Sequence, residues 1–188
     1  MEFSELIKNR YSCRAYAARK VEKELIYKIV GEAINAPSAK NTQPWEFYVS
    51  CEEETNEKIR SCLQDNGKNG FLSSAPAFIA IFEEAPDNIA CEKYGNDRFV
   101  KYDVGQVAAY LMLSAKNKGL DSCVIGWVDE ERLREVTGVN KPCGIVIAFG
   151  YAAEGISAPQ KRRDLIEKKI INYQELGYDI KKIGSLNI

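Results

Sequence analysis

The feature that most constrains the fold is an uninterrupted apolar run at residues 77–82, with the sequence AFIAIF. A strand-length run without a polar residue is typical of a central β-strand that is covered on both faces. Further strands are expected at residues 45–50 and 144–151, and a turn leads into another short strand at residues 120–127. The chain of 188 residues is long enough to build one compact domain with a real core around this central strand.

Helical segments are predicted between the strands. Helical spacing of apolar residues, leading acidic residues and capping residues indicate helices over residues 3–8, 22–35, 53–63, 102–118 and 130–136. Ser4 and Asp129 are the expected N-caps of the first and last helix, and Gly119 is the expected end of the long one. Because helices and strands do not alternate strictly, the order favours an α+β sandwich with a mostly antiparallel sheet over a doubly wound fold.

The composition excludes several kinds of chemistry. The chain contains no histidine, which removes Ser-His-Asp and Cys-His nucleophiles, histidine zinc ligands and histidine acid–base steps. Its 26 basic and 27 acidic residues nearly cancel, which argues against a nucleic-acid partner because phosphate backbones select basic surfaces. No G-x-G-x-x-G, G-x-x-x-x-G-K-[ST] or G-x-S-x-G motif is present. An enzyme of this composition is expected to take its chemistry from a cofactor.

The cysteines and the apolar segments indicate the compartment. No stretch approaches the roughly 20 apolar residues of a membrane span, and the opening MEFSELIKNR does not resemble a secretion signal. We therefore expect a cytoplasmic protein without membrane association and with reduced thiols, although an even number of cysteines also permits disulfides. No two cysteines form a C-x-x-C pair, which disfavours a metal site. They are Cys13, Cys51, Cys62, Cys91, Cys123 and Cys143.

Arg10, Ser12 and Arg14 form the first candidate binding site. In an extended segment, residues two apart point to the same side, so the two guanidinium groups would flank the hydroxyl group. Such a set suits a phosphate dianion, which accepts paired hydrogen bonds from arginine. The alternative is a pair of solvated arginines near a helix end.

Three further segments carry candidate binding groups. The loop at residues 37–45 is stiffened by prolines and carries amides that match the edge of a heterocycle, or it is an ordinary helix-to-strand connection. At residues 123–127 an apolar strand runs into Gly126, where a flat ligand could approach the backbone, or where the strand simply ends. The basic residues 161–163 would contact a phosphate or form a solvated face.

The segment at residues 154–188 combines dense charge with apolar side chains that require burial. It is either a surface helix packed on its own domain or an arm that wraps a partner chain, and composition favours neither. The apolar side chains in question are Leu165, Ile166, Ile170, Ile171 and Tyr173.

Taken in order, these segments resemble the FMN-dependent nitroreductase family. The resemblance rests on R-x-S-x-R at residues 10–14, A-P-S-A-x-N-x-Q-P-W at 36–45, the long helix, the I-G-W turn at 125–127 and K-x-R at 161–163. It covers nearly the whole chain, and the segment at 36–45 is its most specific part. It implies an α+β fold with a central, mostly antiparallel sheet flanked by helices. It also implies a domain-exchanged homodimer with FMN sites between the subunits.

The same resemblance implies roles for individual segments. Residues 1–155 would form the FMN-binding domain, and residues 156–188 would be an arm packed on the partner subunit. Arg14 would stabilise the negative charge of the reduced flavin, whose N5 atom carries the chemistry, and no other catalytic residue is implied. Tyr11 replaces a basic residue that many members have, so the phosphate shell has one charge fewer. The implied cofactor-binding residues are Arg10, Ser12, Arg14, Pro37, Ser38, Ala39, Asn41, Gln43, Ile125, Gly126, Lys161 and Arg163.

The implied activity is the reduction of nitroaromatic, quinone or similar small acceptors by ping-pong hydride transfer, with NAD(P)H as the donor. One alternative is a different flavin reaction on the same fold, such as reductive dehalogenation or flavin fragmentation. Another is a flavin-binding protein without a substrate, and a third is a cofactor-free α+β binding module. Residues 83–98 match no part of the family pattern, so they leave the acceptor open.

Overall fold

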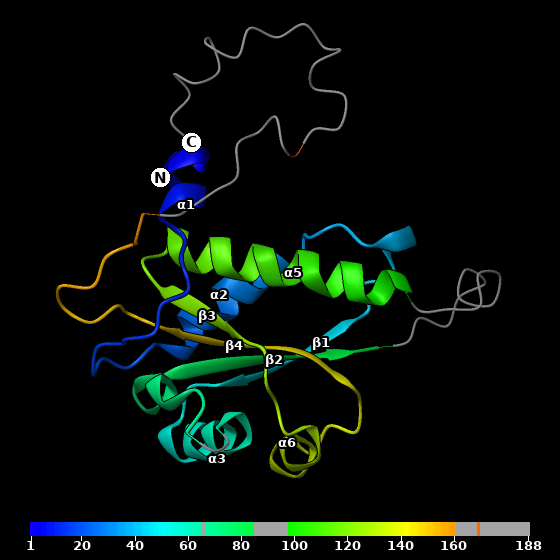
Figure 1. Ribbon diagram of the computed structural model, residues 1–188. Helices are drawn as coiled ribbons and strands as arrows, with labels where there is room; N and C mark the ends of the chain where they lie inside the picture. Colours follow the sequence, from blue (N-terminus) through cyan, green and yellow to red (C-terminus); the bar gives the residue numbers. More distant parts are fainter. Residues whose placement is uncertain (65–66, 85–97, 161–168, 170–188) are drawn as a thin grey trace, which may run out of the picture.

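The architecture is an antiparallel sheet with helices on both faces. The computed structural model describes residues 1–64, 67–84, 98–160 and 169. Within this part of the chain a four-stranded sheet has the order β1-β2-β4-β3, and all of its neighbouring strands are antiparallel (Figure 1). The strands are β1 (Trp45–Ser50), β2 (Ala77–Glu83), β3 (Asp121–Ile125) and β4 (Cys143–Gly150). The α+β fold expected from the sequence is confirmed.

β2 is the central strand that its apolar sequence predicts. It pairs with β1 on one side and β4 on the other, and all of its residues are buried. Ile79 and Ile81 belong to one apolar core, whereas Phe78 and Phe82 belong to a second one. Successive side chains of a strand point to opposite faces, so this single strand anchors the core on each side of the sheet.

Helices close both faces of the sheet (Figure 1). On one face, α2 (Lys23–Ala33) packs against the long helix α5 (Arg98–Asn117), which also contacts α1 (Phe3–Asn9). On the other face, α3 (Glu53–Leu63) packs against α6 (Glu130–Thr137). Short 3₁₀ helices, η1 (Ala39–Asn41) and η2 (Gly70–Ser74), lie in the connections. Among the described residues, no helix is both long enough and apolar enough to cross a membrane.

Two predicted helix ends are confirmed in their atomic detail. The Asp129 carboxylate caps α6 by accepting a hydrogen bond from the backbone N–H of Arg132 at 3.1 Å. Gly119 follows α5 with a φ angle of 84°, a left-handed conformation in which glycine has no steric penalty.

Two other predicted helix ends are wrong. Ser4 is not the N-cap of α1, because the first turn already closes with a hydrogen bond from Leu6 N–H to the carbonyl of Glu2. α5 begins at Arg98 rather than at residue 102, because the buried Val100 extends the apolar side of the helix toward its N-terminus. Most of the predicted irregular segment at 83–98 lies outside the described residues.

Replacement of Gly150 by alanine is expected to lower the free energy of unfolding by about 1–3 kcal/mol. A Cβ atom at this position would lie 2.7 Å from Pro76 Cδ and 2.7 Å from Tyr16 Cδ1. Gly31 in α2 is the matched control, since a Cβ atom there meets nothing within 4 Å. Gly31→Ala should raise the free energy of unfolding by about 0.5–1 kcal/mol, because alanine favours a helix interior. Urea unfolding measures both, and an equal effect of the two substitutions would contradict this packing.

Candidate functional site

The arginine segment lies along the outer edge of β3. Ser12 forms a parallel bridge with Ser122, and the Cys13 N–H donates to the Ser122 carbonyl at 3.0 Å. Tyr11 and Cys13 are buried, whereas Ser12 and Arg14 are exposed. The segment is therefore extended, and its side chains alternate as the sequence predicts.

The positive charges of the two arginines of this segment both reach the Cys123 thiol. Burial raises the pKa of the Cys123 thiol, and the positive charges of Arg14 and Arg10 oppose that rise, so both arginines act on the same thiol. The Arg14 guanidinium lies 5.9 Å from the centre of the Phe71 ring. Within residues 1–64, 67–84 and 98–160, neither arginine forms an ion pair with a carboxylate. Two cations without anionic partners beside an exposed hydroxyl group form a donor set for an anion.

Tyr11 contributes to packing rather than to this donor set. Its ring belongs to the core under α3 and α6, and burial raises the pKa of its hydroxyl group. The Lys116 ammonium lies 5.4 Å from the centre of the Tyr11 ring and forms an ion pair with Asp121 at 2.7 Å. The segment is therefore anchored against the C-terminal end of α5.

The loop between α2 and β1 has a strained backbone. Lys40, Asn41 and Gln43 have φ angles of 54°, 58° and 48°, a conformation that costs about 1–3 kcal/mol for each residue other than glycine. The Ser38 hydroxyl accepts a hydrogen bond from the Gln43 N–H at 3.0 Å, and the Gln43 side chain donates to the Asn41 carbonyl at 3.3 Å. Ser38 and Gln43 therefore hold the loop, and the side chain of Asn41 is exposed at its tip.

A residue that the sequence analysis missed ties this loop to α5. The Asp103 carboxylate accepts hydrogen bonds from the Ala39 N–H at 3.0 Å and from the Gln106 side chain at 3.3 Å. Asp103 is only 3% exposed. The signal in the sequence is an acidic residue beside Val104, at the start of the apolar stripe of α5. Pro37 precedes the loop and is exposed.

The end of β3 offers an open backbone. Ile125 is the last residue of the strand and is buried, and Gly126 follows it in an exposed position. A Cβ atom at Gly126 would meet nothing within 4 Å, so the packing of this chain does not require glycine there. The position can accommodate a flat ligand against the backbone.

The structure does not bring the predicted site residues together within one chain. The segment with Arg10 and Arg14 lies beside Lys116, whereas the loop with Asn41 lies beside Asp103. At about 1.5 Å of rise per residue, these two positions on α5 are about 20 Å apart. Figure 1 shows the two segments near opposite ends of this helix. The remaining predicted residues, Lys161 and Arg163, lie outside the described residues.

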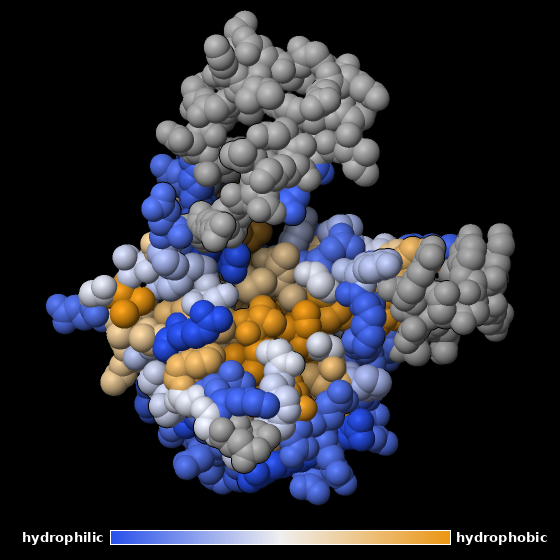
Figure 2. Space-filling view, in the orientation of Figure 1, coloured by the Kyte–Doolittle hydropathy of each residue, from blue (hydrophilic) through white to orange (hydrophobic). Residues whose placement is uncertain are grey.

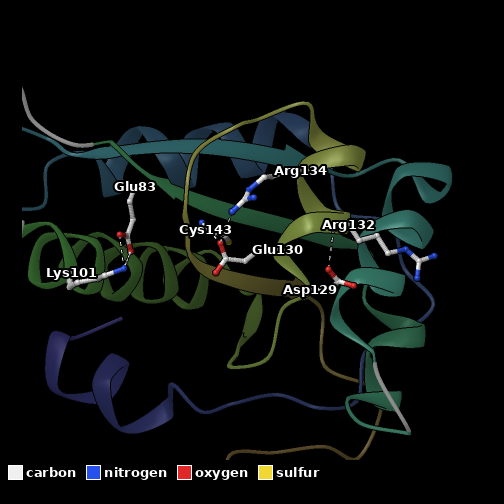
Figure 3. Close-up of polar contacts among 7 residues, drawn as sticks. All are labelled: Glu83, Lys101, Asp129, Glu130, Arg132, Arg134 and Cys143. Atoms are coloured by element: carbon white, nitrogen blue, oxygen red, sulfur yellow. Dashed lines mark hydrogen bonds and ion pairs between the residues drawn. The ribbon is translucent and has the colours of Figure 1, made fainter.

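Separate polar contacts join α6 to the start of β4 and α5 to the end of β2 (Figure 3). The Glu130 carboxylate accepts a hydrogen bond from the Cys143 N–H at 3.4 Å. The Lys101 ammonium forms an ion pair with the buried Glu83 carboxylate at 2.6 Å. Burial, together with the negative charges of Glu130 and Glu83, raises the pKa of the Cys143 thiol to about 12. This thiol is therefore protonated at neutral pH and is a poor nucleophile.

Comparison with known proteins identifies the class from the fold and then the family from the sequence. A protein from Exiguobacterium sibiricum, provisionally assigned as a nitroreductase and solved in complex with FMN, has a TM-score of 0.77 and 26% identity, over 90% of this chain and 96% of its own length. The chain thus has the nitroreductase-like fold. Residues 7–151 match the Nitroreductase family, so the chain belongs to that family.

Two similar proteins are named for different activities. A Bacillus subtilis (strain 168) protein provisionally named NAD(P)H nitroreductase is 29% identical, over 81% of this chain and 90% of its own length. An iodotyrosine deiodinase from Haliscomenobacter hydrossis is 24% identical, over 86% of this chain and 84% of its own length.

The Cys143 thiol makes the stability of the fold depend on pH. Its pKa is 9.0 ordinarily and about 12 in the folded protein, so the folded state holds the proton more tightly. The stabilisation is present below pH 9 and is lost as the pH rises above it. We expect the free energy of unfolding to fall by roughly 1 kcal/mol more in the wild type than in Cys143→Ser between pH 8 and pH 10. If the free energy of unfolding of the wild type and of Cys143→Ser, measured in urea, changed equally with pH, the burial of this thiol would be contradicted.

Proposed function

We propose that the protein is an FMN-dependent oxidoreductase that takes electrons from NAD(P)H and reduces nitroaromatic, quinone or similar small acceptors. The arginine segment along β3 carries this proposal, because Arg10 and Arg14 flank Ser12 without a carboxylate partner in the described chain. Membership of the nitroreductase family and the FMN complex of a structural relative support it.

The residues present fit FMN. Its phosphate and ribityl chain would accept hydrogen bonds from Arg10, Ser12 and Arg14, with Arg14 on the side of the ring, and arginine can bind a phosphate through two hydrogen bonds. The open backbone at Gly126 leaves room for the flat ring system beside the end of β3. FMN, when bound, supplies the two-electron redox chemistry that this histidine-free chain lacks.

The chain itself would supply binding, orientation and charge. Arg14 would place a fixed positive charge beside the ring and so favour the reduced, negatively charged cofactor. The Gly126 N–H, which follows the last residue of β3, would donate toward the ring from a rigid strand end. Lys161 and Arg163 would complete the phosphate contacts. No side-chain acid is required for hydride transfer.

The separation of the two site segments along α5 favours a site built from two copies of the chain. The arginine segment of one subunit and the loop with Asn41 of the other would meet around one FMN. Figure 2 shows apolar residues gathered on the middle of the face between α5 and α6. Exposed large hydrophobic side chains include Tyr102 on α5, which is 62% exposed, and Val124 on the edge strand β3, which is 40% exposed. An apolar surface of this kind is typical of a subunit contact.

We also propose that the division of the chain follows this assembly. Residues 1–155 would form the FMN-binding domain, and residues 156–188 would pack as an arm on the partner subunit. The last described strand, β4, and the Tyr16–Ala152 bridge both lie on the N-terminal side of this proposed boundary.

Reductive dehalogenation is the second candidate activity, because iodotyrosine deiodinases are among the relatives of this chain. It would use the same cofactor contacts and differ in the acceptor. Steady-state assays with a nitroaromatic, a quinone and a halogenated tyrosine, each with NADH and with NADPH, separate the two candidates. Turnover of the halogenated tyrosine alone would replace the first candidate by the second.

Arg14→Ala is expected to weaken FMN binding by about tenfold to a hundredfold, because one charge-assisted contact is lost. Quenching of FMN fluorescence during titration of the apoprotein measures the affinity. Lys58→Ala is the control, since Lys58 is an exposed cation paired with Glu54 on α3. The FMN affinity of Lys58→Ala should equal that of the wild type. An Arg14→Ala protein that purifies yellow with full activity would refute this role.

A mixed dimer tests whether two chains build each site. One subunit carries Arg14→Ala and the other carries Asn41→Ala, with a different affinity tag on each. If each site combines the two segments from different subunits, one site per dimer is intact and binds one FMN with wild-type affinity. If each site lies within one chain, both sites carry a substitution and neither reaches wild-type affinity. The two single-variant homodimers are the controls.

A further inference from the structure

The loop between α2 and β1 depends on a buried carboxylate for its connection to the rest of the chain. Among the described residues, the hydrogen bonds of residues 38–43 have both partners within residues 38–45 apart from one. That one runs from the Ala39 N–H to the Asp103 carboxylate at 3.0 Å and joins residues 64 positions apart in the sequence.

The Asp103 carboxylate is held in place by its own helix, α5. Asp103 lies in α5, is 3% exposed, and accepts a second hydrogen bond from the Gln106 side chain, which lies on the same helix face. A rigid helix therefore presents a fixed acceptor to a loop that contains three left-handed residues, Lys40, Asn41 and Gln43. Such a conformation persists only where its surroundings determine it.

We propose that Asp103 is a positioning residue, which fixes the loop so that Asn41 is presented to the cofactor in a single orientation. This inference rests on the proposed FMN-dependent function. Asp103 does not touch the cofactor in this arrangement. It acts through Ala39, whose N–H it accepts, and its contribution is the order of the loop before the cofactor binds.

The chemistry of the contact predicts which substitutions preserve it. An asparagine side chain retains a carbonyl oxygen that can accept from Ala39, and the Gln106 amide can rotate to accept from the new amide group. An alanine leaves the Ala39 N–H without this acceptor in a partly buried place. Asp103→Asn should therefore rescue what Asp103→Ala loses, whereas a role for the negative charge itself would make the two variants equal.

Two measurements test the proposal. Trypsin cleavage after the exposed Lys40 reports the mobility of the loop without any cofactor, and fluorescence titration reports the FMN affinity. Asp103→Ala should raise both the cleavage rate and the Kd for FMN by about tenfold or more. Asp103→Asn should stay within about threefold of the wild type in both.

Asn56→Ala is the matched control for lost stability. Asn56 is buried in α3 on the opposite face of the sheet, where it accepts from the Ser50 hydroxyl at 2.7 Å and donates to the Pro76 carbonyl at 2.8 Å. This variant should lose stability in urea unfolding and keep the wild-type cleavage rate at Lys40 and the wild-type FMN affinity.

The outcomes separate the inference from the proposed function. Unchanged cleavage at Lys40 in Asp103→Ala, or an equal change in Asp103→Asn, would overturn the positioning role. Faster cleavage with unchanged FMN affinity would also overturn it, since the loop would then not serve the cofactor. A wild-type protein that binds no FMN would overturn the proposed function and the part of the inference that depends on it, while the cleavage result would still show whether Asp103 holds the loop.

Discussion

The burial of β2 on both faces is the constraint on which the other elements depend. Its large side chains alternate between two cores, and full burial of one such side chain contributes about 1.5–3 kcal/mol. Helices must therefore cover both faces, with α5 as the long cover on one of them (Figure 1). The length of α5 in turn separates the arginine segment from the loop that precedes β1, and this separation determines how a cofactor site can be built.

Local patterns in the sequence were sufficient for most of the fold. The apolar run predicted β2 as the central strand, and the capping residue Asp129 and the terminal Gly119 marked helix ends that depend only on neighbouring residues. One of the two errors occurred where a backbone contact outweighed a side-chain preference. Ser4 has the chemistry of an N-cap, but the hydrogen bond to the carbonyl of Glu2 had already closed the turn.

The candidate site was predictable only in part, because some of its features are local and others depend on contacts between distant parts of the chain. The alternation around Ser12 is a local property of an extended segment and was visible in the residues themselves. The contact between Asp103 and Ala39 joins distant parts of the chain, and no spacing rule in the sequence indicates it. The strained conformations of Asn41 and Gln43 depend on such contacts, so they also required the structure. The contributions of Lys161 and Arg163 remain predictions from the family resemblance.

The parallel pairing of the arginine segment with β3 has a consequence for the behaviour of the protein outside its native state. β3 is an edge strand, and an uncovered edge offers free N–H and C=O groups to the strands of other molecules. The bridge between Ser12 and Ser122 covers part of this edge with the same segment that we propose binds the phosphate. Release of the segment would therefore expose an aggregation-prone edge, so that loss of the ligand and intermolecular strand pairing would share one structural origin.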